Sequence, residues 1–121
     1  MTYVFERVIS PKLGFCYDTG HRNCFEPTID LLSLFGDKLV ALHLHDNDGT
    51  GDQHRIPFEA GIDWQEQMSK IAETGYTGAT TIECTTGIPG ALTPNDSRSA
   101  EELLRDAFAA AEKLDALRTK R

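Results

Sequence analysis

Apolar residues recur along the chain at two different spacings, which separate strands from helices. Short runs with strand-like composition predict three strands, at residues 13–18, 38–45 and 79–84. Helical spacing, bounded by capping and stop residues, predicts helices at 2–9, 27–35, 64–74 and 100–117. Helices and strands therefore alternate along the sequence, which is typical of an α/β fold with parallel strands and outer helices.

The last two predicted helices carry the clearest boundary signals. Asp63 can cap the third helix with Glu66 three residues on, and Gly75 can end it. Ser99 and Glu102 have the spacing of a capping box at the start of the fourth helix. The apolar stripe of that helix, which we expect to be buried, consists of Leu103, Leu104, Ala107, Phe108, Ala111 and Leu114.

The middle strand ends in two histidines. Because successive strand side chains point to opposite faces, His43 and His45 are expected on one face, together with Leu39 and Ala41. The opposite face is expected to carry the aliphatic side chains of Val40, Leu42 and Leu44. Such a strand buries one face and offers two imidazoles on the other.

The neighbouring strands also end in side chains that can bind metal. Asp18, followed by His21, ends the first strand, and Glu83 ends the third. In parallel α/β folds, active sites lie beyond the carboxyl ends of the strands, so these groups should converge. Carboxylates and imidazoles are common metal ligands, and we predict a metal site there. For Glu83 the alternative is an ion pair with Arg55 or Lys38.

Two further candidates lie in the polar, glycine-rich loop at 46–61. Asp52 and His54 could bring two ligands to a second metal, or they could form an ordinary solvated turn. A histidine pair such as His43 and His45 could also be held only by hydrogen bonds. On residues alone, these alternatives stay open.

Size and composition fit one small soluble domain, residues 1–121. Of its 121 residues, 40% are hydrophobic and 26% are charged, and no apolar run approaches the roughly 20 residues of a membrane helix. Three widely spaced cysteines indicate reduced thiols and a cytoplasmic location. A formal charge of −7 disfavours nucleic acid as a partner, because that binding depends on Lys and Arg.

Four segments together resemble motifs of the xylose isomerase-like TIM barrel superfamily, which contains sugar and sugar-phosphate isomerases and epimerases and the abasic-site endonucleases. Residues 14–21 and 42–49 look like its sixth-strand and seventh-strand motifs, 52–64 like the following loop and 81–83 like its eighth strand. The resemblance implies the C-terminal portion, strands six to eight, of a (β/α)8 barrel. Three strands cannot close a barrel. Either the chain is a piece of a longer protein, or another chain supplies the missing wall, most simply as a homo-oligomer.

The resemblance also implies a divalent metal held by Asp18, His43 and Glu83, with His45 as the alternative to His43. His21 would lie close to the substrate or on a second metal. In the endonuclease branch, Asp52 and His54 would bind additional metal. Imidazole ligands favour Mn²⁺ or Zn²⁺, with Mg²⁺ and Co²⁺ as alternatives.

The function expected from these residues is that of a metal-dependent sugar or sugar-phosphate isomerase or epimerase, or a C-terminal fragment of one. Glu83 would be a ligand and the base, His21 would hold a substrate hydroxyl, and Arg55 would contact a phosphate or hydroxyl. One alternative is a phosphodiester hydrolase like the abasic-site endonucleases, which the acidic charge disfavours. The other is a catalytically inactive, truncated assembly module.

Overall fold

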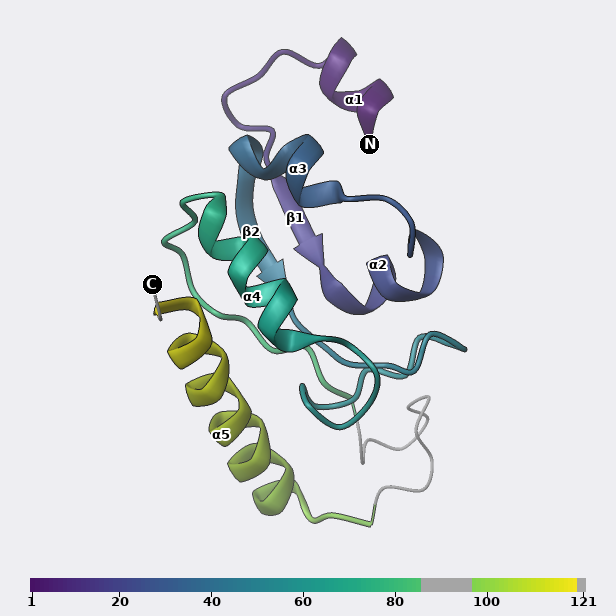
Figure 1. Ribbon diagram of the computed structural model, residues 1–121, viewed down its shortest axis with the longest axis vertical. Coiled ribbons are helices and arrows are strands. Elements are labelled where there is room, and N and C mark those ends of the chain that lie inside the picture. Colours follow the sequence, from purple (N-terminus) through teal and green to yellow (C-terminus); the bar gives the residue numbers. More distant parts are fainter. Residues whose placement is uncertain (86–96, 120–121) are drawn as a thin grey trace.

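A computed structural model describes residues 1–85 and 97–119 (Figure 1). Two parallel strands lie at the centre, and helices flank them. In chain order the described elements are α1 (Thr2–Arg7), β1 (Phe15–Asp18), α2 (Thr19–Phe25), α3 (Leu31–Phe35), the 3₁₀ helix η1 (Gly36–Lys38), β2 (Leu39–His43), α4 (Trp64–Glu73) and α5 (Ala100–Thr119). The expected mixed α/β fold with parallel strands is thus confirmed.

Residues 79–84 do not form the predicted strand, but they do lie beside the end of β2. Leu44 donates its backbone N–H to Thr81 O at 2.8 Å and accepts from the N–H of Glu83 at 3.0 Å, which makes a single parallel bridge. The pairing stops there because the next polar backbone groups, those of Asp46, pair instead with Arg55. Three chain segments therefore lie side by side, with residue 83 beside the end of β2.

A register shift changes which side chains of β2 face the helices. Phe15 pairs with Leu39, but Cys16 pairs with Ala41, so Val40 is the extra residue of β2. Leu39 consequently packs against the core, and Val40 is 65% exposed. The predicted faces of Leu39 and Val40 were therefore wrong. From Ala41 onward the alternation holds, and Leu42 and Leu44 are buried.

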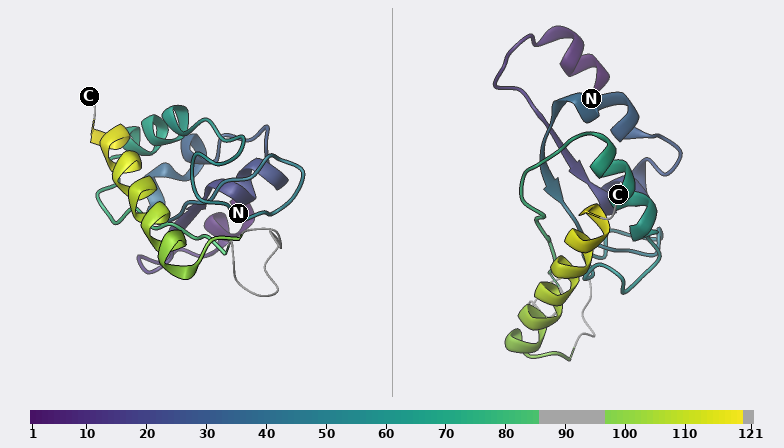
Figure 2. Two further views of the ribbon diagram at one scale, coloured as in Figure 1. Left: turned by 90° about the horizontal axis from the view of Figure 1, so that it is seen from below. Right: turned by 60° about the vertical axis from the view of Figure 1, so that its left-hand side comes forward.

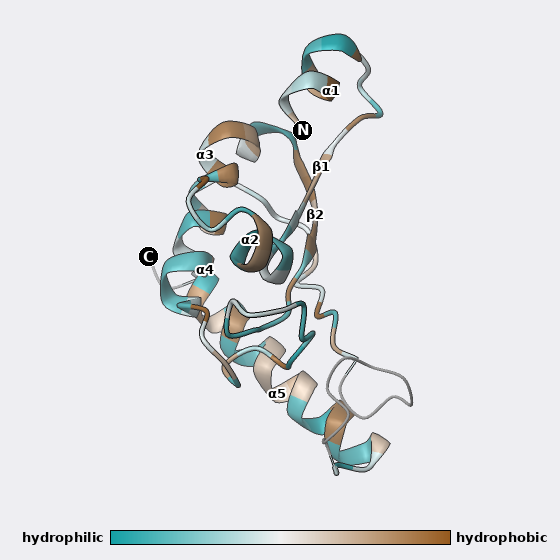
Figure 3. Cartoon of the chain, turned by 90° about the vertical axis from the view of Figure 1, so that its right-hand side faces the viewer, coloured by the Kyte–Doolittle hydropathy of each residue, from teal (hydrophilic) through white to brown (hydrophobic). Residues whose placement is uncertain are grey.

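In the part of the chain that the structure describes, the core lies on one face of the strands. Phe15 and Tyr17 of β1 and Leu42 of β2 pack against the helices, whereas Cys16 and His43 on the opposite face are exposed. Figure 3 shows the strands at one side of the molecule, with α2, α3 and α4 all on the other side. This open face is the one that carries the predicted site.

Helix α4 joins the strands to α5. The buried Tyr17 hydroxyl donates to Gln67 Oε1 of α4 at 2.6 Å, and burial raises the pKa of Tyr17 to about 12. Met68 and Ile71 of α4 and Leu114 of α5 are fully buried in the same core. The C-terminal half of α5 lies beside α4 (Figure 2).

The helix ends agree with several predictions and correct others. Asp63 accepts from Glu66 N, and Ser99 and Glu102 exchange the hydrogen bonds of a capping box, as predicted. Leu104 and Phe108 were expected in the buried stripe of α5, but they are 70% and 67% exposed. Buried Ala110 and Leu114 face the core instead.

Two boundaries differ earlier in the chain. The helix expected at 27–35 begins only at Leu31, where Asp30 caps it by accepting from Ser33 N. Helix α2 follows β1 where no helix was expected. Among the described residues, no helix is long and apolar enough to cross a membrane.

Candidate functional site

His45 lies at the centre of the site and is fully buried. Thr19 fixes its backbone, because the Thr19 hydroxyl donates to His45 O at 3.0 Å and accepts from His45 N at 3.1 Å. Gly20 lies directly under the ring, and a Cβ at that position would collide with the imidazole. Neither Thr19 nor Gly20 was among the expected site residues. Their position between Asp18 and His21 is the only sequence signal for them.

Asp18 connects the end of β1 to two imidazoles. Its Oδ1 caps α2 by accepting from His21 N at 2.8 Å and lies 2.9 Å from His45 Nε2. Its Oδ2 lies 2.9 Å from His21 Nδ1. Burial raises the pKa of Asp18, but the hydrogen bonds from His45 and from the His21 N–H together hold it below the ordinary value. Asp18 is therefore a carboxylate at neutral pH.

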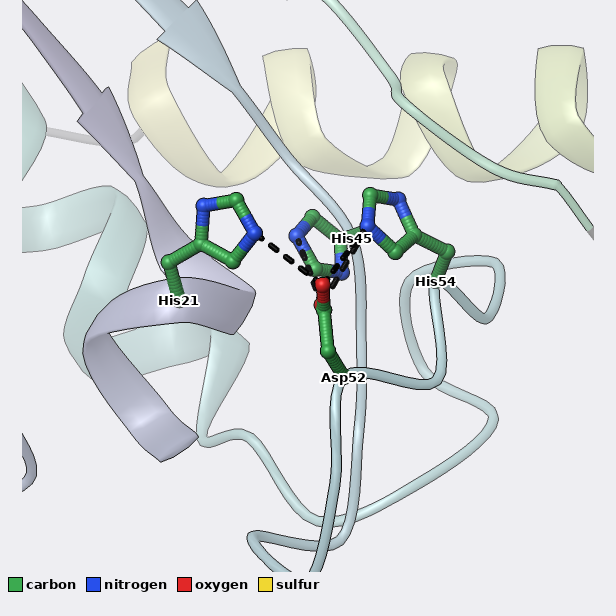
Figure 4. Close-up of side chains that lie close together, drawn as sticks. All are labelled: His21, His45, Asp52 and His54. Atoms are coloured by element: carbon green, nitrogen blue, oxygen red, sulfur yellow. Dashed lines mark hydrogen bonds and ion pairs between the residues drawn. The ribbon is translucent and has the colours of Figure 1, made fainter. Parts of the chain in front are cut away.

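Three imidazoles surround the carboxylate of Asp52 (Figure 4). His21 of α2 places Nε2 3.1 Å from Oδ2, and His54 of the loop places Nε2 3.2 Å from both oxygens. His45 Nε2 lies 3.9 Å from Oδ1. Asp52 and His54 thus belong to a close cluster, and the solvated turn considered for them is not what the chain forms.

The donors and acceptors in this cluster are compatible with a bound cation. A carbonyl only accepts, so His54 Nδ1, 3.2 Å from Glu83 O, must carry a proton. The other ring nitrogen of His54, Nε2, faces the Asp52 carboxylate. His21 has carboxylate oxygens of Asp18 and Asp52 at both ring nitrogens. A histidine that binds a metal typically donates its other N–H to a carboxylate or carbonyl, which is the arrangement at His54 Nδ1.

The structure gathers two sets of side chains whose potential ligand atoms lie within 4.8 Å of one another. Each offers nitrogen and oxygen donors of the kind that Zn²⁺ and Mn²⁺ accept. The first set is His21, His45, Asp52 and His54, and the second is Asp18, His45 and Glu83. His45 belongs to both sets, and its buried Nδ1 has no hydrogen-bond partner among the described residues. The donor set therefore fits a divalent metal.

His43 and Glu83 meet on the open face. His43 Nδ1 lies 3.0 Å from Glu83 Oε2 and 4.0 Å from Asp18 Oδ2. Glu83 thus pairs with a histidine rather than with Arg55 or Lys38, the partners considered from the sequence. The set with ligand atoms within 4.8 Å of one another contains His45 with Asp18 and Glu83, and His43, the expected ligand, lies beside the same two carboxylates.

Among the described residues, the Arg55 side chain forms no ion pair or hydrogen bond with any of these groups, and its buried Nε has no hydrogen-bond partner. Its backbone pairs with Asp46, and its charge acts on Asp48 in the loop. Hydrogen bonds from Thr50, assisted by the charge of Arg55, lower the pKa of the exposed Asp48 to about 2. The substrate contact expected of Arg55 stays a prediction.

Known proteins similar to this chain include fructoselysine 3-epimerases. Fructoselysine 3-epimerase of Shigella flexneri is 41% identical over 61 residues, which make up 50% of this chain and 22% of that protein. An uncharacterised protein of Sinorhizobium fredii is 42% identical over 74 residues, 60% of this chain and 24% of the relative. One of Methanocaldococcus jannaschii is 32% identical over 83 residues, 66% of this chain and 28% of the relative. The matched part is thus about a quarter of each of these relatives.

No solved structure matches the chain. A family model described as "Xylose isomerase-like TIM barrel" matches residues 1–116, nearly the whole sequence. The match includes both strands, the loop with Asp52 and His54, and the residues around Glu83. The chain belongs to the xylose isomerase-like TIM barrel family.

Proposed function

We propose that this chain forms the metal-binding part of a sugar or sugar-phosphate isomerase or epimerase. The observation that carries the proposal is the convergence of Asp18, His45 and Glu83, from three neighbouring chain segments, with ligand atoms within 4.8 Å of one another. Its similarity to fructoselysine 3-epimerases supports an epimerase within this class. We further propose strands six to eight as the part of the barrel that the chain forms.

Asp18, Glu83 and one imidazole would hold the metal. We favour His45 as that imidazole, because it is buried and contacts Asp18 at 2.9 Å, whereas His43 is 47% exposed in its side chain. The nitrogen donor favours Mn²⁺ or Zn²⁺. His21, Asp52 and His54 offer a second set of ligand atoms beside the first.

A divalent cation at this position would polarise the carbonyl and neighbouring hydroxyl of a sugar and thereby stabilise an enediolate. Glu83 stands on the open face and is 37% exposed in its side chain, so it can accept the proton from the carbon beside the carbonyl. His43, at 3.0 Å, holds the orientation of that carboxylate. His21, half exposed at the rim, would hold a substrate hydroxyl, which would take the place of one of the two carboxylate oxygens now beside its ring nitrogens.

The site needs a further wall to enclose a substrate. The face that carries His43 and Glu83 is open to solvent on the side away from the helices, and the matched relatives are several times longer than the matched segment. We propose that the remaining part of the barrel covers this face, either as the rest of a longer chain or as another copy. Substrate specificity would then reside largely in that part.

Metal analysis of the purified protein, followed by Mn²⁺ and Zn²⁺ titration, tests the metal. Exchange of substrate hydrogen with deuterium from solvent, using fructoselysine and simple ketoses as probes, tests the proton transfer. We expect binding that is lost in D18N and E83Q, and exchange that requires Glu83. Absence of binding up to millimolar metal would contradict the proposal. Binding without exchange would favour the inactive assembly module.

A further inference from the structure

Asp46 directly follows the site histidine but is directed away from the site. Its carboxylate is completely buried and accepts four hydrogen bonds. Oδ2 accepts from the N–H groups of Phe58 and Ala60 at 3.0 and 3.1 Å and from Trp64 Nε1 at 2.8 Å, and Oδ1 accepts from Ile62 N at 3.1 Å. A buried carboxylate is costly unless it is hydrogen-bonded, and here four donors compensate for the burial.

The backbone of Asp46 holds the loop that supplies Asp52 and His54. Asp46 N donates to Arg55 O at 2.8 Å, and Arg55 N donates to Asp46 O at 2.9 Å. The loop between these two residues carries Asp52 and His54. His54 adopts a left-handed backbone with φ of 48°, which is uncommon for a residue other than glycine and requires support from its surroundings.

Asp46 therefore holds the residue at which the loop returns and the segment that follows it. Its backbone holds residue 55, where the loop returns, and its side chain holds residues 58 to 64, which follow. The backbone of His54 itself is held, in the described part of the chain, by Thr85 N, which donates to His54 O at 3.2 Å. Without the carboxylate, three backbone N–H groups and an indole N–H would lose their acceptor.

We infer that Asp46 is a positioning residue, which places Asp52 and His54 against His21 and His45 without binding a cation itself. The inference rests on the proposed function only where it concerns cation affinity. Both oxygens of Asp46 accept hydrogen bonds, from backbone N–H groups within residues 58–62 and from Trp64 of α4. The carboxylate is therefore a structural acceptor, although its position after two histidines resembles that of a ligand.

D46N tests this inference in the full 121-residue chain. The substituted amide keeps the shape but replaces one acceptor oxygen with an NH₂ donor, so at least one loop N–H loses its partner. We expect the His54 Nδ1 proton, which is hydrogen-bonded to Glu83 O, to disappear from nitrogen–proton correlation spectra. We also expect Zn²⁺ or Co²⁺ affinity to fall by about 10- to 100-fold, as when outer-shell partners are lost.

Two further variants separate positioning from general instability. D63N changes a neighbouring aspartate that caps α4, and Asn caps equally well, so the His54 signal and the affinity should stay unchanged. W64F keeps the Asp46 charge and removes one of its four donors, so it should give a smaller change in the same direction.

A His54 proton signal that persists unchanged in D46N would overturn the inference. So would an unchanged cation affinity in a D46N protein that has lost the signal. If the unaltered protein binds no cation, the proposed function fails, but the His54 signal still decides whether Asp46 positions the loop. If D46N does not fold, W64F decides by the same two measurements.

Discussion

The imidazole rings of His45 and His54 lie parallel, with their centroids 3.9 Å apart and their planes at 3°. One ring follows β2 and the other comes from the loop after it, so the stack joins these two parts of the site. The stack holds the two rings face to face, and both belong to the same set of potential ligands with His21 and Asp52.

Addition of metal should stabilise the folded protein. A cation that binds only the folded state adds about 2.7 kcal/mol when its free concentration is a hundred times the Kd. We expect thermal unfolding to move to higher temperature with Zn²⁺ or Mn²⁺ and to return to its initial value with a chelator. D52N and D18N together should remove the response. A midpoint that does not depend on metal in the unaltered chain would contradict this prediction.

His43, the last residue of β2, and His45, two residues further on, should differ in their effect on metal affinity. H45Q should weaken binding at least about 100-fold, beyond the range typical of outer-shell partners, because His45 lies in both ligand sets. H43Q should leave binding nearly unchanged and should slow proton transfer, since His43 contacts the carboxylate of Glu83. Calorimetric titration measures the metal affinity of both variants, and hydrogen–deuterium exchange of the substrate measures the proton transfer. The reverse order would identify His43 as the ligand.

Gly20 should not tolerate a side chain. In G20A the new Cβ would collide with the His45 ring, so we expect weaker metal binding and a lower midpoint of unfolding. Gly51 provides the matched control, because a Cβ there has nothing within 4 Å, and G51A should behave like the unaltered protein. Equal behaviour of the two variants in metal titration and thermal unfolding would show that the ring is not confined by Gly20.

Stability should fall at alkaline pH because of Tyr17. Its pKa is about 12 in the folded protein and 10.0 ordinarily, so the unfolded chain releases the proton first as pH rises. Below pH 10 the tyrosine is neutral in both states, so its ionisation does not affect stability. As pH approaches 12, the free energy of unfolding falls by about 2 kcal/mol.

The difference in unfolding free energy between the unaltered protein and Y17F, measured from pH 8 to 12, isolates this contribution. It should decrease above pH 10. Y3F, which changes an exposed tyrosine, should show no such decrease. A difference that stays constant across this range would contradict the assignment.

The two leucines of α5 should differ strongly in their contribution to stability. Leu114 is completely buried, so L114A should lower the unfolding free energy by about 2–5 kcal/mol. Leu104 is 70% exposed, and L104A should change it by no more than about 0.5 kcal/mol. Urea denaturation measures both. A large loss in L104A would show that this surface is covered by another chain.

The gathering of Asp18, a histidine of the middle segment and Glu83 could be predicted, although His43 was the expected histidine and His45 the alternative, because it follows from two local rules. Side chains alternate along a strand, and parallel strands bring their carboxyl ends to one edge. The same rules failed at Val40, because a register shift depends on the partner strand, which the sequence of one strand does not contain. Local pattern therefore predicted that side chains from the three segments gather at one edge, but it did not predict the face of every β2 residue.

Helix α2 could not be predicted from propensity. Its sequence includes Gly20 and Asn23, which are poor helix formers, and it lacks an apolar stripe. It forms where the Asp18 carboxylate caps its first turn. The place of Asp52 was also beyond local rules, because Asp46 fixes its loop through donors 12 to 18 residues away.

Asp18 ends β1 and caps α2 at once, so no flexible residue separates the strand from the helix that carries His21. The orientation of this carboxylate is consequently settled when the chain folds, before any ligand arrives. Its conformational entropy is lost during folding and does not oppose binding. Such a preorganised centre should discriminate sharply between ions by coordination geometry, because it has little freedom to rearrange around a poorly matched one.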